Sequence, residues 1–399
     1  MHNFKTLLAE EWIMKKRGIT IWAAGLLATV GIGWHSVAAE PVTFGIVLPL
    51  TGERDGYGHS ILIGMQARAK KINAEGGVLG GRPIVFDILD TESRPERAAE
   101  AVTELARRPE VLVIFGPHTS GEFAAMLGPA REQEIAVIAP TATQNGITRD
   151  NPWAFRVTFS NGFQGMAMAR FLLERLGRRR FALFTDQRHV YTTDLSEDFR
   201  NTVTERGGEI VSDLYFDQSA NDDQTDYSPA LRTIADADPE VLFISAYSDE
   251  VQVIIRQVDK IGLSAVLCGG DAWDSESVFQ GSGFRLEGSY YIASFSVVAD
   301  DPEVTAFMES MREAGMDVPD SAAALGYDTV TVGVIALERA EEPTRQGFRD
   351  ALLTLSDLPL LTGKTTITPE GEAIKSAHIM EIVREGNKLS AVEAERLDP

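Results

Sequence analysis

Residues Phe115–Gly121 combine hydroxyl side chains with the expected start of a helix. The apolar run 111–114 before them predicts a buried strand, and residues 122–127 after them predict the first helical turns. Helix starts carry unpaired N–H groups and partial positive charge, so with the hydroxyls of Thr119 and Ser120 they suit a carboxylate or another small anion. Alternatively, Ser120 only caps its own helix. The stretch alone leaves both interpretations open.

The elements that must position this stretch alternate between short apolar strands and helices. A first series runs from Val42 to Thr143, and a second runs from about Asn161 to Trp273. Such alternation is typical of βαβ units with parallel sheets. We therefore predict an α/β fold with two doubly wound parallel-sheet lobes.

Polar and glycine-rich clusters follow the strands of both series. These clusters are Thr51-Gly52, Thr119-Ser120, Thr141–Thr143, Asp186–Tyr191, Tyr247 and Asp271. Ligands of open parallel sheets bind beyond the carboxyl ends of the strands. Because each series supplies several clusters, a cleft between the two lobes would bring them face to face.

The first 39 residues have the pattern of a secretory signal peptide. Basic residues 14–17 precede the apolar run 19–32, and the small residues Val37–Ala39 precede Glu40. We predict export to the periplasm with cleavage after Ala39, and Met14 is an alternative start. A retained N-terminal anchor is the other interpretation. No cysteine lies at the cleavage site, so a lipid anchor is not expected.

The charge of the chain argues against several classes of partner, and its cysteine content excludes disulfide bonds within the chain. The formal net charge is −22 at pH 7, which argues against nucleic acid or an anionic membrane as a partner. Cys268 is the only cysteine, so no disulfide can form within the chain. Stability must come from packing, and acidity does not identify the ligand.

The usual signatures of catalysis and of bound cofactors are absent from the sequence. The six histidines show no metal-binding spacing, and the nucleotide-binding glycine motifs do not follow any strand after residue 40. Ser120 lies near His118 but lacks the Gly-x-Ser-x-Gly turn of a nucleophile. We expect a protein without enzymatic activity, metal or cofactor, with a periplasmic hydrolase as a minor alternative.

Several short motifs occur in a characteristic order. They are Gly45–Gly52, Tyr57-Gly58, Ala74–Pro83, Asp90–Glu92, Phe115–Pro117, Ile138–Thr143 and Gly326–Asp328. Each is weak alone, but in this order the chain resembles the leucine/isoleucine/valine-binding family of ABC importers, which are type I periplasmic solute-binding proteins. The resemblance extends from about Val42 to about Val383.

The resemblance implies two lobes joined by three crossovers, near Val157, Tyr291 and Gly363. The expected segments are 40–157 with 292–363 for lobe I and 158–291 with 364–399 for lobe II. The lobes would close like a hinge on a small polar solute, an amino acid or an amide, and a monomer would deliver it to an ABC permease in the inner membrane. A ligand sensor without an importer is the alternative within the same fold.

The resemblance also implies how an amino acid is held. Its carboxylate would contact Ser120, Thr143 and the backbone at Thr141, in agreement with the anion site inferred from the residues. Its ammonium would meet Asp271, because a carboxylate in a water-poor cleft needs a cationic partner. The alternative is that Asp271 is a solvated turn residue.

Aromatic residues are expected to enclose the ligand. Tyr57 and Tyr247 would close over it from opposite lobes, unless they are ordinary packing residues. Tyr191 is a further candidate, although the segment 186–193 is longer than the family pattern and lacks a glycine after this tyrosine.

Three large side chains near these positions set up a hypothesis on specificity. We hypothesise that Arg188, His189 and Trp273 give a side-chain preference other than plain leucine or valine. The sequence does not identify the ligand's side chain.

Overall fold

The computed structural model describes residues 40–220, 225–296 and 302–398. The predicted signal peptide and its cleavage site lie outside these residues. Within the described part of the chain, every helix is too short or too polar to cross a lipid bilayer.

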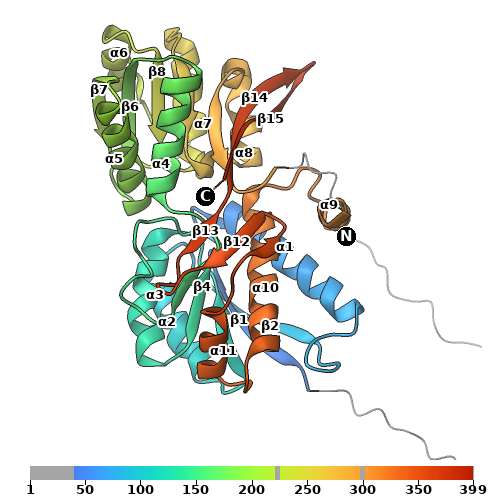
Figure 1. The fold of residues 1–399 in the computed structure, drawn as a ribbon. Helices are drawn as coiled ribbons and strands as arrows, with labels where there is room; N and C mark the ends of the chain where they lie inside the picture. Colours follow the sequence, from blue (N-terminus) through green and yellow to red (C-terminus); the bar gives the residue numbers. More distant parts are fainter. Residues whose placement is uncertain (1–39, 221–224, 297–301, 399) are drawn as a thin grey trace, which may run out of the picture. The chain divides into compact units, whose positions relative to one another are not determined.

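The first half of the chain builds a five-stranded sheet in the order β2-β1-β3-β4-β5, in which all strands are parallel (Figure 1). The strands are β1 (Val42–Leu48), β2 (Ile84–Asp90), β3 (Val111–Phe115), β4 (Ala136–Ala139) and β5 (Ala154–Arg156). The helices that connect them are α1 (Asp55–Ala74), α2 (Pro95–Ala106) and α3 (Ser120–Glu132). The continuous apolar strands predicted a sheet covered on both faces, and this prediction is confirmed.

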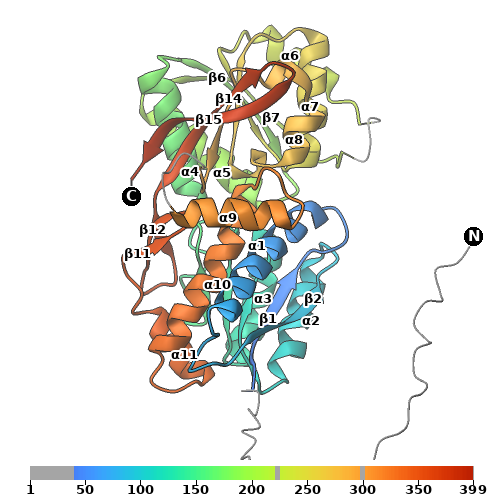
Figure 2. The ribbon, with the colours of Figure 1, turned by 90° about the vertical axis from the view of Figure 1, so that its right-hand side faces the viewer.

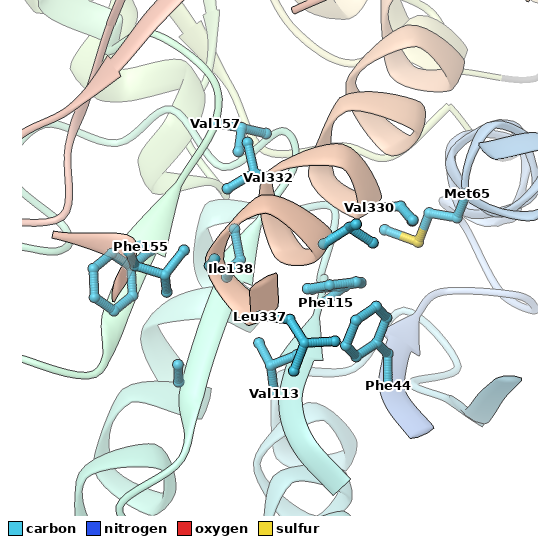
Figure 3. Packing of buried hydrophobic residues seen from close by; sticks show 14 of the residues in the cluster. Phe44, Met65, Val113, Phe115, Ile138, Phe155, Val157, Val330, Val332 and Leu337 are labelled. Atoms are coloured by element: carbon cyan, nitrogen blue, oxygen red, sulfur yellow. The ribbon is translucent and has the colours of Figure 1, made fainter. Parts of the chain in front are cut away.

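Two helices from far along the chain complete this layer. They are α10 (Ser321–Arg339) and α11 (Arg345–Leu352). Figure 3 shows Phe44, Val113 and Phe115 of the strands packed together with Val330 and Leu337 of α10. The first core therefore joins segments separated by more than half of the sequence.

The second sheet has seven strands in the order β15-β14-β10-β9-β8-β6-β7. Strands β6 to β10 run parallel, and the hairpin β14–β15 adds to the β10 edge in antiparallel register. The strands are β6 (Arg180–Asp186), β7 (Glu209–Phe216), β8 (Val241–Ser245), β9 (Val266–Gly269), β10 (Tyr290–Ala293), β14 (Ala377–Glu385) and β15 (Lys388–Leu397). The associated helices are α4 (Asn161–Arg170), which continues as a π-helical turn over Phe171–Arg175, α5 (Val190–Glu205), α6 (Ser228–Asp236), α7 (Ser248–Ile261) and α8 (Glu276–Gly281).

The remaining elements pack with the first sheet. Strands β11 (Leu358–Leu360), β12 (Gly363–Ile367) and β13 (Ala373–Lys375) form a small antiparallel sheet, and their buried Leu358 and Ile367 belong to the first core. Helix α9 (Pro302–Glu313) lies against α1 and α10 (Figure 2).

The strands and helices that the structure describes require three passages of the chain between the two large sheets. The passages lie after β5, after β10 and at Ser376, between β13 and β14. We expected them near Val157, Tyr291 and Gly363. Tyr291 lies inside β10, and Gly363 begins β12, so residues 364–375 stay with the first core instead of joining the second sheet. Ile367 explains this difference, because its side chain is buried in the first core.

Helices α1 and α10 cross in unusually close contact. A Cβ atom on Gly64 would lie 1.9 Å from the carbonyl oxygen of Ala323, and one on Gly326 would lie 2.3 Å from that of Ile61. Only glycine fits at both positions, since backbone atoms occupy the space that any side chain would need.

Candidate functional site

A cavity lies where the carboxyl ends of the strands of the two large sheets meet. Its volume is about 30 Å³, and its lining residues are Tyr57, His118, Ser120, Thr141, Tyr191, Tyr247, Asp271, Ala272, Asp274, Ser294, Ser321, Ala322 and Leu325. All of the predicted site residues are therefore brought together here except Thr143, which is buried behind the lining. The volume corresponds to about one water molecule.

Ser120 is the first residue of α3, and its hydroxyl is not the helix cap. Thr119 is the cap: its Oγ1 accepts from the N–H of Glu122 (3.2 Å), and the Glu122 carboxylate accepts from the N–H of Thr119 (3.3 Å). The interpretation in which Ser120 only caps its helix is therefore wrong. Ser120 Oγ accepts from the N–H of Gln144 (3.2 Å) and keeps its own proton for another acceptor.

The loop after β4 lies beside this helix start. Thr141 Oγ1 donates to the carbonyl of His118 (2.9 Å), and the N–H of Asn161 donates to the carbonyl of Thr143 (2.7 Å). The Thr143 hydroxyl is buried and has no hydrogen-bond partner among the described residues. This hydroxyl and that of Ser120 are the free donors of the predicted anion site.

Arg156 holds this loop from behind. Its Nη1 donates to the carbonyls of Ala142 (3.3 Å) and Gln144 (2.9 Å), the two neighbours of Thr143. Its Nη2 pairs with the carboxylate of Glu372, in the turn between β12 and β13. The sequence analysis did not identify Arg156, because the contacts form only in the folded chain.

Asp271 faces the cavity from a 3₁₀ turn that follows β9. Its carboxylate accepts from the hydroxyl of Tyr191 (2.8 Å), and its N–H donates to Gln164 Oε1 (3.0 Å). Burial raises the pKa of Asp271 to about 6. Asp271 is thus a half-buried cavity carboxylate, not a solvated turn residue, and it is mostly ionised at neutral pH.

Three tyrosines and one histidine form the aromatic part of the wall. The rings of Tyr57 and His118 stack at a centroid distance of 4.2 Å, and Tyr247 lies 6.2 Å from Tyr57 and 5.1 Å from Tyr191. Tyr191 belongs to the first turn of α5. This helical placement directs its hydroxyl to Asp271.

His118 is a cavity residue that the sequence analysis considered only as the base of a nucleophile. Its Nδ1 lies 3.0 Å from Thr141 Oγ1, and its Nε2 is buried without a partner among the described residues. Burial, with the nearby Arg54, lowers the pKa of His118 to about 3. The imidazole is therefore neutral. The sequence did offer a signal for His118, because it lies two residues before Ser120 in the loop after β3.

Asp274, Ser294 and Ser321 form a second polar wall. The N–H of Ser321 donates to Asp274 Oδ2 (2.8 Å), and the N–H of Ser294 donates to Ser321 Oγ (3.0 Å). The hydroxyl of Ser294 is buried without a partner in the described chain. Burial, and then the neighbouring Asp320, raise the pKa of Asp274 to about 7. No motif pointed to these residues, which meet only through tertiary structure.

A charged cluster adjoins the cavity behind Tyr247. The Arg54 guanidinium lies 4.3 Å from the centroid of the Tyr247 ring, and it pairs with Asp249 (3.2 Å) and Glu250 (3.5 Å). Burial alone would raise the pKa of Glu250, but Arg54 and Arg188 outweigh it and lower this pKa. The cluster thus consists of mutually neutralised charges.

The three residues of the specificity hypothesis lie outside the cavity lining. Arg188 pairs with Asp186 and Glu250, and His189 lies edge-on to Tyr247 at 5.2 Å. Trp273 is fully buried in the second core and donates from Nε1 to the carbonyl of Ile244 (3.2 Å). The hypothesis is therefore wrong for Trp273, which packs in the second core and does not line the cavity.

A larger cavity, of about 660 Å³, lies beside α4, β13 and β15. It contains none of the predicted site residues, and several of its charged lining residues pair with each other, such as Arg175 with Glu395 (3.2 Å). Among the described residues, no group of histidine, cysteine, aspartate and glutamate side chains is arranged to hold a metal ion.

Comparisons with known proteins agree with this architecture. Residues 41–387 match the periplasmic binding protein family. A Leu/Ile/Val-binding protein of Rhizobium johnstonii is 24% identical over 345 residues, which cover 86% of this chain and 91% of that protein.

Two crystal structures show the same fold. The leucine-binding protein of Thermotoga maritima is 27% identical, with a TM-score of 0.81 over 90% of this chain and 99% of that one. The substrate-binding protein of a branched-chain amino acid transporter from Streptococcus pneumoniae, solved with isoleucine, is 28% identical, with a TM-score of 0.82 over 90% and 100% of the two chains. The predicted α/β architecture of two parallel-sheet lobes is confirmed.

Proposed function

The chain belongs to the periplasmic binding protein family, and from this premise we propose that it captures an amino acid for an ABC importer. The observation that carries the proposal is the pairing of opposite chemistries across one cavity. Ser120 offers a hydroxyl proton at a helix start, whereas Asp271 offers a half-buried carboxylate. A helix start attracts a carboxylate, and a carboxylate partly removed from water favours a cationic partner. A free α-amino acid carries both groups.

The relatives support this class of ligand. The Streptococcus pneumoniae protein was solved with isoleucine, and the Rhizobium protein is named for leucine, isoleucine and valine. Both observations concern those proteins, and they favour a small zwitterion over other solutes for the present chain. The contacts proposed here are those of Ser120 and Thr143 with the carboxylate, of Asp271 with the ammonium, and of the three tyrosines with the rest.

The size of the cavity supports capture by hinge closure. An amino acid is several times larger than the present space of about 30 Å³, so the walls have to part before it enters. The walls come from two sheets that three crossovers connect, which is the arrangement of a hinge. The proposed lobes are 40–156 with 294–375 and 157–293 with 376–399.

The remaining elements of the proposal concern the cellular context. Residues 1–39 would direct export to the periplasm, where a monomer would present its closed form to the permease. A sensor role would use the same binding site, and a permease gene beside this one would favour import.

Thermal unfolding of residues 40–399 in the presence of single amino acids tests the proposal. A ligand at a hundredfold excess over its Kd stabilises a protein by about 2.7 kcal/mol, and each kcal/mol raises Tm by about 2–4 °C in domains of 150–250 residues. Ser120→Ala and Asp271→Asn should remove most of the shift, whereas Asp317→Asn, at an exposed position, should retain it.

Two results would contradict the proposal. One is a complete lack of response to all twenty amino acids. The other is a response to carboxylates or amides without an ammonium group, since this would remove the role given to Asp271. Conversion of a bound ligand into a product would instead support the hydrolase alternative.

A further inference from the structure

We propose that this site selects an amino acid whose short side chain ends in a hydrogen-bond donor, so that threonine and asparagine bind better than valine and leucine. The inference rests on the proposed function and narrows its substrate class. It is based on two buried polar atoms that lack partners and line the same cavity, His118 Nε2 and Ser294 Oγ.

The hydrogen bonds of Thr141 fix the role of His118. Thr141 has one hydroxyl proton, which it donates to the carbonyl of His118 at 2.9 Å. Thr141 Oγ1 must then accept the hydrogen bond from Nδ1, at 3.0 Å. Nδ1 therefore carries the proton of the neutral ring, and Nε2 presents a lone pair. Nothing in the described chain donates to this lone pair, so a ligand is the available donor.

Ser294 provides the second unpartnered group. Its backbone N–H is used by Ser321, but its hydroxyl is free and only 1% of the residue is exposed. Asp274 lines the same wall, and the lone pairs of its carboxylate oxygens that are not used by Ser321 are further acceptors. A buried polar atom without a partner is unfavourable, so an aliphatic ligand side chain in this cavity would leave the Ser294 hydroxyl and His118 Nε2 unsatisfied.

The charge of the cavity lining determines which polar ligand side chains are preferred. Two carboxylates, Asp271 and Asp274, line the cavity, and no lysine or arginine is among the described lining residues. An acidic ligand side chain would therefore meet the negative charge of Asp271 and the lone pair of His118 Nε2. Hydroxyl and amide side chains have the N–H or O–H that this wall can accept.

The aromatic packing limits the length of the side chain. Tyr57 stacks on His118, and both rings lie within 6.2 Å of Tyr247 by centroid distance. Together with the cavity volume of about 30 Å³, this packing favours a short ligand side chain over a long one.

Isothermal titration of residues 40–399 with matched pairs of amino acids tests this inference. Threonine and valine have nearly the same shape, as do asparagine and leucine. We expect threonine to bind at least about tenfold more tightly than valine, since sites built around a polar group reject analogues that lack it. Asparagine should likewise bind more tightly than both leucine and aspartate.

Variants assign the preference to the two groups. His118→Leu and Ser294→Ala should each lower the ratio of threonine to valine affinity, toward equality in the first case. His59→Leu, at an exposed position of α1, is the matched control and should keep the ratio. If His118→Leu does not fold, Ser294→Ala still gives the answer, because it removes a single oxygen.

The outcomes separate this inference from the proposed function. Equal or tighter binding of valine and leucine overturns the inference and leaves amino-acid capture standing. A ratio that neither variant changes also overturns it. Absence of binding by every amino acid overturns both proposals.

Discussion

The hydroxyl of Tyr57 on α1 donates a hydrogen bond of 2.7 Å to the backbone carbonyl of Ala272, which follows a strand of the other large sheet. The same oxygen accepts from the N–H of Ser248 (3.1 Å), at the start of α7. Burial raises the pKa of Tyr57, so the hydroxyl keeps its proton at any physiological pH. One side chain thus joins the first sheet to two segments of the second.

Substitution of this tyrosine should weaken the closed state. Tyr57→Phe removes both hydrogen bonds and leaves the ring in place. At about 1 kcal/mol for a typical hydrogen bond, we expect the Kd of the ligand to rise about fivefold to thirtyfold, mainly through faster dissociation. Stopped-flow kinetics with a bound ligand measures this. Tyr215→Phe, at an exposed tyrosine, is the control. An unchanged dissociation rate would show that these hydrogen bonds do not stabilise closure.

Ligand affinity should depend on pH through Asp271. Its pKa of about 6 in this structure would fall when an ammonium group binds, because the nearby positive charge favours the ionised form. The part of the affinity that depends on Asp271 should therefore be constant above about pH 6 and should fall by up to about tenfold per pH unit below it. His118, with a pKa of about 3, does not titrate in this window. The test is to measure Kd from pH 5 to pH 8.

A matched variant isolates this titration from that of Asp274. Asp271→Asn cannot ionise, so it should bind weakly and lose the slope between pH 5 and pH 6. The same slope in wild type and Asp271→Asn would assign the effect to another group.

The charged cluster behind Tyr247 should contribute to stability. Arg54→Met leaves the buried Glu250 with only Arg188 as its cationic partner. Breaking a buried pair costs about 3–5 kcal/mol when the remaining charge is unpaired. Because Arg188 remains, we expect a loss of about 1–3 kcal/mol in the free energy of unfolding, measured by urea denaturation. Arg312→Met, on the exposed face of α9, should change it little. Equal effects of the two variants would contradict a role for the cluster.

Arg156 should affect affinity without affecting ligand preference. Arg156→Lys cannot reach the carbonyls of both Ala142 and Gln144, so the loop with Thr143 loses its anchor. We expect affinity for every amino acid to fall about tenfold, corresponding to about 1.4 kcal/mol, while the ratio of threonine to valine is retained. A changed ratio would mean that Arg156 acts on the side-chain wall. Titration of both amino acids against this variant distinguishes the two results.

The strands within the two series could be predicted because their signals are local, whereas strands outside them, such as β14 and β15, were not predicted. Apolar strands and amphipathic helices alternate, and their carboxyl ends had to converge, so Ser120, Tyr247 and Asp271 could be grouped without coordinates. The start of α5 carries no local sequence signal, because His189 provides no capping side chain. Ser294 and Asp274 carry no pattern at all, since they meet only through their hydrogen bonds to Ser321, the first residue of α10.

Trp273 shows a different limit. It stands two residues after Asp271, and proximity in sequence suggested proximity to the ligand. The 3₁₀ turn sends its ring the other way, over Gly269, where an added Cβ would lie 2.1 Å from the indole nitrogen. The indole ring fills space in the second core. Packing of this kind cannot be inferred from the sequence around one residue.

The close contact of α1 and α10 at Gly64 and Gly326 limits how the sequence of this protein can evolve. The two helices carry Tyr57, Ser321 and Leu325 to one side of the cavity, and at Gly64 and Gly326 their backbones leave no room for a side chain. Substitutions in these two helices are therefore costly for packing, even at positions far from the ligand. New substrate preferences would have to evolve on the opposite side, through the short segments that follow the strands of the second sheet.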